Sequence, residues 1–317
     1  MPTLLEASSA YCRRLARERA RSFYYGFVLL PRPKRDAFYA IYAFMRYCDD
    51  VADGGDSLPD KAAKLHAWRD AMDRALQGDY PANDASSPGE PGFSDGAKIL
   101  PAFHHAAHRY AIPAQYFHEL LDGVAMDLSI RTYRSFEDLY QYCYRVASVV
   151  GLCSLHIFGF RDPAAEKLAV ECGIAFQLTN ILRDLREDAQ AGRIYLPLED
   201  LERFGYSPEQ LVAGVYNENF ERLMQFQIAR AKHYYERAQP LIGMVEPESR
   251  PALWTMMAIY RGILAVIERN RGNVFSRRAS LSEMEKLSLL LRAAKMHLKL
   301  RLRPDANLAQ EWQRFRG

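Results

Sequence analysis

The apolar residues of this chain recur at intervals of three and four positions, which is the period of a helix that buries one face. The segment 34–52, which follows Pro33, shows this pattern most clearly. One face of it carries Ala37, Ile41, Phe44, Tyr47 and Cys48. A proline at the start and Gly54-Gly55 directly after the pattern are typical of the two ends of a helix. We therefore predict a helix here that packs its apolar face against a core.

The same period extends through most of the chain, and Pro, Gly, Ser or Asn residues separate the periodic segments. Short alternating runs of β-branched residues, which indicate strands, are nearly missing. Further helices are predicted over 59–76, 97–110, 113–128, 136–158, 163–186, 219–238, 250–268 and 282–300. We expect an all-α fold in which these helices form a bundle.

The segment 78–96, GDYPANDASSPGEPGFSDG, is rich in Gly, Pro, Ser and Asp and has little apolar surface to bury. We expect a flexible surface loop here. The part of the chain before this loop is short, and its acidic motif needs a partner found later in the chain. The 317 residues are therefore predicted to form a single helical domain, 1–317.

The composition fits a globular protein with a substantial core, because 49% of the residues are hydrophobic and 26% are charged. The five cysteines show neither CxxC pairs nor the density of a disulfide scaffold, which favours a reducing compartment. The N-terminal segment is charged where a secretory signal needs an apolar core, so we expect a cytoplasmic protein that is not exported. The longest uncharged apolar stretch, 146–160, is shorter than the roughly 20 residues of a spanning helix and predicts a buried one.

The charge is uneven along the chain. From residue 286 to residue 317 there are eight Lys or Arg against two Asp or Glu, whereas the whole chain carries a net charge of only +3. Two interpretations of this basic C-terminal part, with its tail at about 299–317, stay open: a solvated helix end, or a patch for peripheral contact with anionic lipid at the inner face of the membrane. Nucleic-acid binding is not expected, because the basic residues are not interleaved with a recognition motif.

The first motif that carries chemistry is DDVAD, residues 49–53, at the end of the predicted helix 34–52. Asp49 and Asp53 are four positions apart, so their carboxylates lie on one face about one turn apart and repel each other. Negative charge near a helix C-terminus adds a second penalty. A bound cation relieves both, and Mg²⁺ commonly uses one or two carboxylates together with substrate phosphates.

The second motif, DLRED, repeats this chemistry with Asp184 and Asp188 after an apolar run. Polar groups suited to phosphate precede each motif: Tyr42 and Arg46 before the first, and Gln177, Asn180 and Arg183 before the second. Two carboxylate pairs on facing helices could hold several Mg²⁺ ions around a diphosphate. The alternative is that both motifs are solvated helix ends.

These residues occur in an order that resembles the squalene/phytoene synthase family over nearly the whole chain, about residues 22–287. The matching segments are RSFYYGFVLLP, YAIYAFMRYCDDVAD, DGVAMDL, YCYRVASVVGL, FQLTNILRDLREDAQAGRIYLP and VFSRRASLSEMEKL. Neither acidic motif departs from the family pattern. The resemblance implies an isoprenoid-synthase-type bundle with a central hydrophobic cavity, and an active Mg²⁺-dependent prenyl transferase.

Carried over by resemblance, the metal ligands are Asp49, Asp53, Asp184 and Asp188, which with Tyr42 are the expected catalytic residues; Mn²⁺ is an alternative metal. The residues that the resemblance implies for substrate binding are Arg21, Ser22, Phe23, Arg46, Gln177, Asn180, Arg193 and Tyr195. An arginine pairs phosphate oxygens through two parallel N–H groups, which suits such a site. For Tyr42 a core aromatic and for Ser22 a helix cap are equally good interpretations. The segment 142–159 is expected to line a tunnel for the prenyl tails, or simply to pack through its small residues.

The implied reaction joins two allylic prenyl diphosphates head to head. One diphosphate departs, the double bond of the second molecule attacks the allylic cation, and closure gives a cyclopropylcarbinyl diphosphate. Phe23 and Tyr42 offer aromatic faces to the cation. Our sequence-based prediction leans to farnesyl diphosphate and a presqualene or squalene product, with NADPH needed only for squalene.

Two alternatives to this function remain open at the level of sequence. One is a phytoene synthase that condenses two geranylgeranyl diphosphates, because one sequence does not show which side chains form the floor of the pocket. The other is a noncatalytic lipid-binding or assembly protein on the same fold, which the intact acidic pairs disfavour.

Overall fold

The structure is a computed structural model that describes the backbone of residues 3–80 and 94–302, and the side chains within these ranges apart from those of residues 21–23, 94, 301 and 302. It is built from helices, and its described part contains two isolated β-bridges in place of strands. The α-helices are α1 Leu4–Arg19, α2 Arg21–Phe27, α3 Arg32–Asp53, α4 Leu58–Leu76, α5 Ser94–Ala97, α6 Leu100–Arg109, α7 Ala114–Ser129, α8 Phe136–Cys143, α9 Val149–Phe158, α10 Ala164–Gln190, α11 Leu198–Arg203, α12 Pro208–Val212, α13 Glu218–Ala238, α14 Leu241–Met244, α15 Arg250–Arg269 and α16 Glu283–Leu302. A π-helical segment, η1 Tyr144–Ser148, and a 3-10 turn, η2 Pro247–Ser249, complete the chain.

The predicted all-α fold is confirmed, and each predicted helix has a counterpart. Six helices were not predicted: α1, α2, α5, α11, α12 and α14, of which α5 falls at the end of the segment predicted as a loop. The first of them is capped by Thr3 and Glu6 but buries only the small residues Ser8, Cys12 and Ala16, so it lacks a strong apolar period. The loop predicted over 78–96 falls largely on residues 81–93, outside the described part, as does most of the basic tail.

Side-chain caps and prolines fix where many helices begin. Ser135 and Ser207 each accept a hydrogen bond from a backbone N–H in the first turn of the helix that follows, and Asn217 does the same for α13. Pro at the first or second position starts α3, α4, α6, α12 and α15. Gly54 ends α3 directly after the DDVAD motif, as the sequence predicts.

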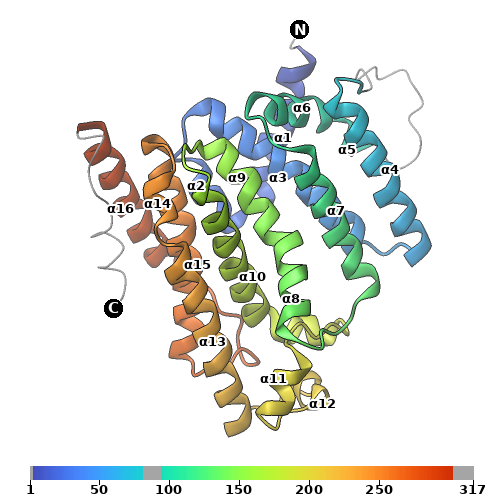
Figure 1. The fold of residues 1–317 in the computed structure, drawn as a ribbon, viewed down its shortest axis with the longest axis vertical. Coiled ribbons are helices and arrows are strands. Elements are labelled where there is room, and N and C mark those ends of the chain that lie inside the picture. The colour runs from blue at the N-terminus through green and yellow to red at the C-terminus, as the bar shows by residue number, and fades with distance from the viewer. Residues whose placement is uncertain (1–2, 81–93, 303–317) are drawn as a thin grey trace.

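Helix α10 is the centre of the bundle. It packs against α13, α15, α9 and η1, whereas α3 packs against α1, α6 and α7 on the other side (Figure 1). The C-terminal ends of α3 and α10 meet, because Arg193, which follows α10, lies 3.6 Å from Asp53, the last residue of α3. This arrangement sets the two acidic motifs at one end of the bundle.

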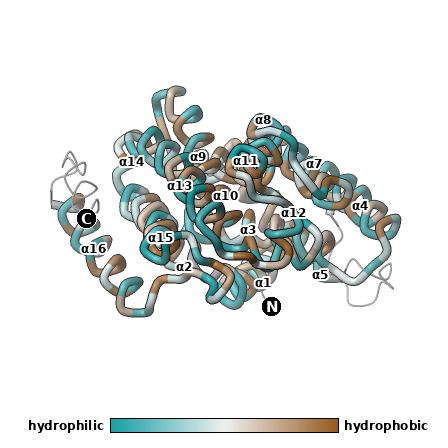
Figure 2. The backbone as a smooth tube through the Cα atoms, turned by 90° about the horizontal axis from the view of Figure 1, so that it is seen from below, coloured by the Kyte–Doolittle hydropathy of each residue, from teal (hydrophilic) through white to brown (hydrophobic). Residues whose placement is uncertain are grey.

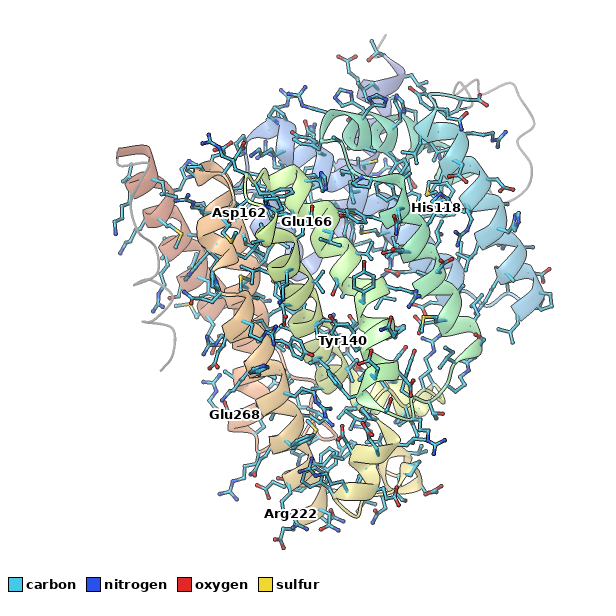
Figure 3. All side chains as sticks on the ribbon, in the orientation of Figure 1. His118, Tyr140, Asp162, Glu166, Arg222 and Glu268 are labelled. Carbon is cyan, nitrogen blue, oxygen red and sulfur yellow. The ribbon has the colours of Figure 1, made fainter. Side chains whose placement is uncertain are left out.

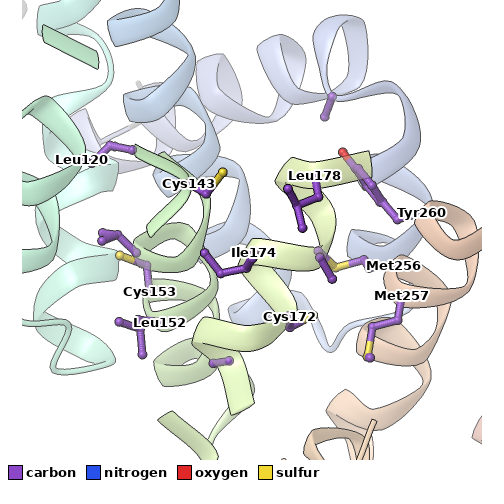
Figure 4. Close-up of a cluster of buried hydrophobic side chains, with 14 of the residues drawn as sticks. Leu120, Cys143, Leu152, Cys153, Cys172, Ile174, Leu178, Met256, Met257 and Tyr260 are labelled. Atoms are coloured by element: carbon purple, nitrogen blue, oxygen red, sulfur yellow. The ribbon is translucent and has the colours of Figure 1, made fainter. Parts of the chain in front are cut away.

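The core joins helices that are far apart in sequence. In Figure 4, Ile174 and Leu178 of α10 lie between Cys153 of α9 and Met257 of α15. The buried apolar side chains form one cluster that extends from Cys12 to Leu300. At the surface, polar pairs tie the same helices together: Glu268 of α15, labelled in Figure 3, forms an ion pair with Lys232 of α13.

The predicted helix 136–158 is divided by η1, which inserts one wide turn between α8 and α9. Here α10 approaches closely. The Ser148 hydroxyl donates to the carbonyl of Val170 at 2.8 Å, and a Cβ on Gly173 would lie only 2.4 Å from the Cα of Ser148. A Cβ on Gly151 would likewise meet the carbonyl oxygen of Ala169 at 2.9 Å. The small residues of this segment therefore serve helix packing, one of the two interpretations that the sequence leaves open.

The segment Pro247–Arg269 is the one stretch of the described chain that is long and apolar enough to cross a membrane, with a mean hydropathy of 1.2. Of its most apolar window, 78% is buried inside the bundle. Burial of this kind is typical of a core helix. The apolar stretch 146–160 is buried as predicted, since Val149, Cys153 and Ile157 have no exposed surface.

The close contact at Gly173 generates a first prediction. Gly173→Ala should lower the free energy of unfolding by about 1–3 kcal/mol, because the added methyl meets backbone atoms that cannot move aside. Gly243→Ala in α14 is the matched control, since nothing lies within 4 Å of its added Cβ. Urea unfolding followed by circular dichroism measures both, and equal stabilities of the two variants would contradict this account of the packing.

Candidate functional site

A cavity of about 450 Å³ opens between α3, α7, α9, α10 and α15. One end of it is polar and the other is apolar. The polar end is lined by Tyr42, Arg46, Asp49, Asp53, Asp127, Tyr142, Gln177, Asn180, Arg183, Asp184, Asp188, Arg193 and Tyr195. The apolar end is lined by residues that include Val150, Ser154, Leu155, Phe158, Ala169, Cys172, Leu241, Leu253 and Met256. The predicted hydrophobic cavity is present, and both acidic motifs face it.

The first acidic pair sits in the last turns of α3. Asp49 and Asp53 line the cavity, whereas Asp50 accepts a hydrogen bond from Arg46 Nε at 2.9 Å. Arg46 also lies 3.9 Å from Asp49, and Arg193 lies 3.6 Å from Asp53. The arginine expected to bind substrate is therefore held between two carboxylates of its own helix.

The second pair lies on α10, where the two carboxylates differ in their surroundings. Asp184 accepts hydrogen bonds from Arg183 and, at 2.7 Å, from Nε of Arg278, which also approaches Glu187 at 3.3 Å. Although burial alone favours the neutral acid, these two arginines hold the pKa of Asp184 below its usual value. Asp188 has no ion-pair partner within 4.0 Å among the described residues.

A fifth carboxylate, Asp127 of α7, completes the polar end. It accepts hydrogen bonds from the hydroxyls of Tyr195 at 2.9 Å and Tyr142 at 3.0 Å. Burial raises its pKa despite these bonds. Asp127 was not predicted as a site residue, and neither were Tyr142 and Arg278. Their one signal in the sequence is that they lie in segments that match the family.

The carboxylates of both motifs line one end of the cavity. Asp49 and Asp53 keep 53% and 61% of their side chains exposed there, whereas Asp184 keeps 19%. Burial, reinforced by the like charges of Asp53, Asp50 and Asp127, raises the pKa of Asp49 to about 7 against the pull of Arg46. Burial and the charge of Asp184 raise the pKa of Asp188 to about 7 as well. Negative charge at this end is thus only partly compensated by the chain itself.

Several polar atoms in the cavity wall lack a partner in the described structure. Asn180 donates to Gln177 at 3.3 Å, but its Oδ1 is buried without a hydrogen bond. The Nε of Arg193 is buried without one too. A free acceptor beside the acidic pairs suits a hydrated cation, and a free guanidinium donor suits a phosphate oxygen. The residues present therefore fit a diphosphate together with divalent cations.

No three His, Cys, Asp or Glu side chains of the described residues are grouped as a ready-made metal site. This agrees with a metal that takes one or two carboxylates and draws its other ligands from substrate phosphates and water. Tyr42 lines the cavity beside Arg46, and burial raises the pKa of its phenol to about 12, so it stays neutral. Of the remaining predicted residues, Arg21, Ser22 and Phe23 begin α2, but their side chains lie outside the described part.

The apolar end runs deep into the bundle. On α10 the lining residues extend from Asp188 to Ala169, more than five helical turns or roughly 28 Å at 1.5 Å per residue. Opposite them, Ala147, Gly151 and Ser154 give the wall small side chains. The segment 142–159 therefore lines the apolar end of the cavity as well as packing on α10. That prenyl tails occupy this space stays a prediction.

Comparison with known proteins agrees with this architecture. The family model for squalene/phytoene synthase matches residues 16–285. The 15-cis-phytoene synthase of Synechococcus elongatus is 38% identical over 303 residues, covering 90% of this chain and 93% of that protein. The phytoene synthase of Mycobacterium tuberculosis is 37% identical over 287 residues, covering 90% and 89%.

Solved structures show the same fold. A dehydrosqualene synthase in complex with ligand superimposes with a TM-score of 0.81 at 29% identity, covering 93% of this chain and 98% of that one. A squalene synthase from Alicyclobacillus acidocaldarius gives a TM-score of 0.77 at 28% identity, covering 87% and 98%. With the family model and the relatives in agreement over most of its length, the chain belongs to the squalene/phytoene synthase family and is a head-to-head prenyl transferase.

Proposed function

We propose that this protein condenses two molecules of geranylgeranyl diphosphate to phytoene, with Mg²⁺ held by Asp49, Asp53, Asp184 and Asp188. The observation that carries the proposal is the two-ended cavity: two acidic pairs on α3 and α10 face one end of a space whose other end is long and apolar. A molecule with a charged head and a hydrocarbon tail is the ligand that such a cavity fits.

The polar end is suited to hold a diphosphate through a mixture of charges. When bound there, Mg²⁺ would offset the negative charge of the diphosphate and favour its departure. Arg193 lies near Asp53, a carboxylate that would turn to the metal, which leaves its guanidinium group available for phosphate oxygens. Arg46 is hydrogen-bonded to Asp50 and would offer its remaining N–H groups. Tyr42, neutral and aromatic, lies at the boundary between the two ends and can face an allylic cation.

The apolar end would protect that cation from water. The second molecule attacks it with its double bond, and loss of a proton closes the cyclopropane ring. Phe158, Leu155 and Met256 line this part of the cavity with side chains that are not nucleophilic. Of the other lining groups, the Ser154 hydroxyl donates to the Val150 carbonyl, and burial raises the pKa of the Cys172 thiol to about 12, so it stays protonated. Departure of the second diphosphate, followed by rearrangement and loss of a proton, gives a linear C40 product without a reductant, so NADPH is not part of the proposed reaction.

The proposed C20 substrate differs from our sequence-based prediction, which favoured farnesyl diphosphate. Relatives at 37% and 38% identity are named phytoene synthases, whereas the similar structures at 28% and 29% are squalene and dehydrosqualene synthases. The length of the cavity is compatible with the longer tail.

The most informative experiment is incubation of the protein with farnesyl or geranylgeranyl diphosphate and Mg²⁺, with and without NADPH, followed by identification of the extracted lipid. Binding of lipid without release of diphosphate would favour the noncatalytic alternative.

A second prediction concerns the metal. EDTA should abolish release of inorganic diphosphate, and added Mg²⁺ should restore it, with Mn²⁺ as a possible substitute to be tested in parallel. Asp49→Ala and Asp184→Ala should each lower kcat by at least about a thousandfold, an effect of the size seen when a group acts mainly in the transition state. Their helical circular dichroism should be unchanged, because neither side chain fills the core. Asp70→Ala on exposed α4 is the control and should keep full activity; turnover that persists in EDTA would contradict the metal assignment.

A third prediction follows from the crowded carboxylates of the metal-free protein. The pKa of Asp49 and of Asp188 is about 7 in the folded chain, against a usual value of 3.8. The folded state therefore binds more protons than the unfolded state between these values, so this contribution to stability grows as the pH falls through about 7 and levels off near 3.8. At pH values above 7, Asp49→Asn and Asp188→Asn should each raise the melting temperature, and each should show less stabilisation on acidification than the wild type.

Thermal melts in EDTA across this pH range measure the effect, with Asp70→Asn as the control that should follow the wild type. The same two variants should gain less than the wild type from Mg²⁺ and a nonhydrolysable substrate analogue, which at 100 times its dissociation constant adds about 2.7 kcal/mol to the wild type. Melting temperatures that match the wild type at every pH would mean that the two carboxylates do not burden the fold.

A fourth prediction addresses the tail of the substrate. Ser154 lines the apolar end about three turns beyond Tyr142 along α8, η1 and α9. Ser154→Phe should shorten the space and lower kcat/KM for geranylgeranyl diphosphate by about tenfold or more relative to farnesyl diphosphate, because an aromatic ring displaces the end of the longer tail. Ser282→Phe, in an exposed position before α16, is the control. An unchanged ratio of kcat/KM values would show that the tails occupy another path.

A further inference from the structure

The last described helix, α16, has apolar side chains on two opposite faces. Leu289, Ala293, Met296 and Leu300 form one face, which is buried against α15 and η2. Met284, Leu287, Leu291 and Leu298 form the other, which we call the outer stripe; they are 75%, 49%, 57% and 60% exposed. At 3.6 residues per turn, the two sets point about half a turn apart. The bundle thus explains only one of the two faces.

The outer stripe stays exposed within the part of the chain that the structure describes. Figure 2 shows α16 at the edge of the molecule, beside α15 and away from the other helices. Among the other large apolar side chains exposed in the described part, Val28 and Leu58 stand apart, and Val212, Val215 and Tyr216 lie at and just after the end of the short helix α12. A row of four on one helix is a concentration that marks an interaction surface.

The charges beside the stripe indicate what it contacts. Lys295 and Lys299 are exposed next to it and form no ion pair with a described residue, and Arg292 is exposed on the same side. The acidic residues of α16, Glu283 and Glu285, both lie in its first turn and are paired with Lys286 and Arg269. Beyond that turn, all charged side chains of α16 are Lys or Arg. Apolar residues flanked by Lys and Arg are typical of helices that lie in a membrane surface.

We propose that the outer stripe of α16 docks this protein on an anionic phospholipid surface. The leucines enter the boundary between headgroups and acyl chains, and the lysines bind lipid phosphates. A second copy of the chain is a poorer partner, because α16 carries five Lys or Arg against two Glu, so two paired stripes would bring an excess of positive charge together.

Docking through α16 would also fix the position of the cavity relative to the membrane. The buried face of α16 lies on α15, and Leu253 and Met256 of α15 line the apolar end of the cavity. A membrane on the outer side of α16 would therefore lie beside the helix pair α15 and α16, and α15 forms part of the wall of the apolar end. If the proposed function is correct, a hydrocarbon product would be released beside the one phase that dissolves it. The docking itself needs no catalysis and is tested without substrate or metal, so its failure is distinct from a failure of the proposed function.

The test is flotation of the full-length protein with vesicles of phosphatidylglycerol and phosphatidylcholine. The wild type should float with them. The triple variant Leu287→Gln, Leu291→Gln, Leu298→Gln should bind at least about tenfold more weakly, because it loses most of the inserted apolar surface. The double variant Leu58→Gln, Val212→Gln is the matched control: both residues are 53% exposed but lie on α4 and α12. It should bind as the wild type does, and all variants should keep the wild-type melting temperature.

The lysines supply a second arm. Lys295→Gln and Lys299→Gln should each weaken binding to the anionic vesicles by about fivefold, the effect of one cation near such a surface. Binding to vesicles of phosphatidylcholine alone should be weaker for the wild type and unaffected by these changes. Absence of wild-type binding, or equal binding of the triple variant, would overturn the proposal.

A polarity-sensitive dye on the outer stripe shows whether lipid, the chain itself or a second copy of the chain covers it. All five native cysteines are buried, so the dye should label Leu291→Cys selectively. Its emission should shift to the blue only when anionic vesicles are added. A blue shift in buffer alone, or a wild-type dimer that the triple variant dissociates in sedimentation, would mean that the chain itself or a second copy covers the stripe, and the proposal would be wrong.

Discussion

Five carboxylates that share one end of an otherwise apolar cavity are the constraint on which the rest of this structure depends. Asp49, Asp53, Asp127, Asp184 and Asp188 come from three helices, and burial penalises the charge of most of them. A fold without a ligand must tolerate this repulsion. It does so with arginines that each serve a carboxylate: Arg46 with Asp50, Arg183 and Arg278 with Asp184, and Arg193 with Asp53.

These arginine pairs give the two carboxylates of the second acidic motif different resting states. Asp184 is held by two guanidinium groups, whereas Asp188 has none within ion-pair distance among the described residues. A ligand that brings its own negative charge competes for the arginines, and cations compete for the carboxylates. In the unliganded site, arginines and carboxylates therefore pair with each other. When a ligand binds, the arginines can pair with its phosphate groups and the carboxylates with its cations.

The sequence predicts the parts of this site that repeat within a helix, and misses the parts that depend on how helices meet. Asp49 and Asp53 are recognisable because their i, i+4 spacing needs no tertiary information, and so are Asp184 and Asp188. Asp127 stands alone on α7, and only the approach of Tyr142 and Tyr195 from other elements makes it part of the site. Arg278 reaches Asp184 from a loop 94 residues away. Likewise α3, α7 and α10 were predictable from long apolar periods, whereas α11 and α12 are too short to show one.

The π-helical segment η1 gives the cavity wall some freedom in length. A single wide turn amounts to one residue inserted into an otherwise continuous α-helix, and the wide turn absorbs that residue. The helix on either side of η1 therefore keeps its register. Val150, Ser154 and Phe158 stay in the cavity wall on the same helical run that sets Tyr142 beside Asp127. A change of one residue within η1 can thus be taken up locally, without turning the apolar wall away from the acidic end.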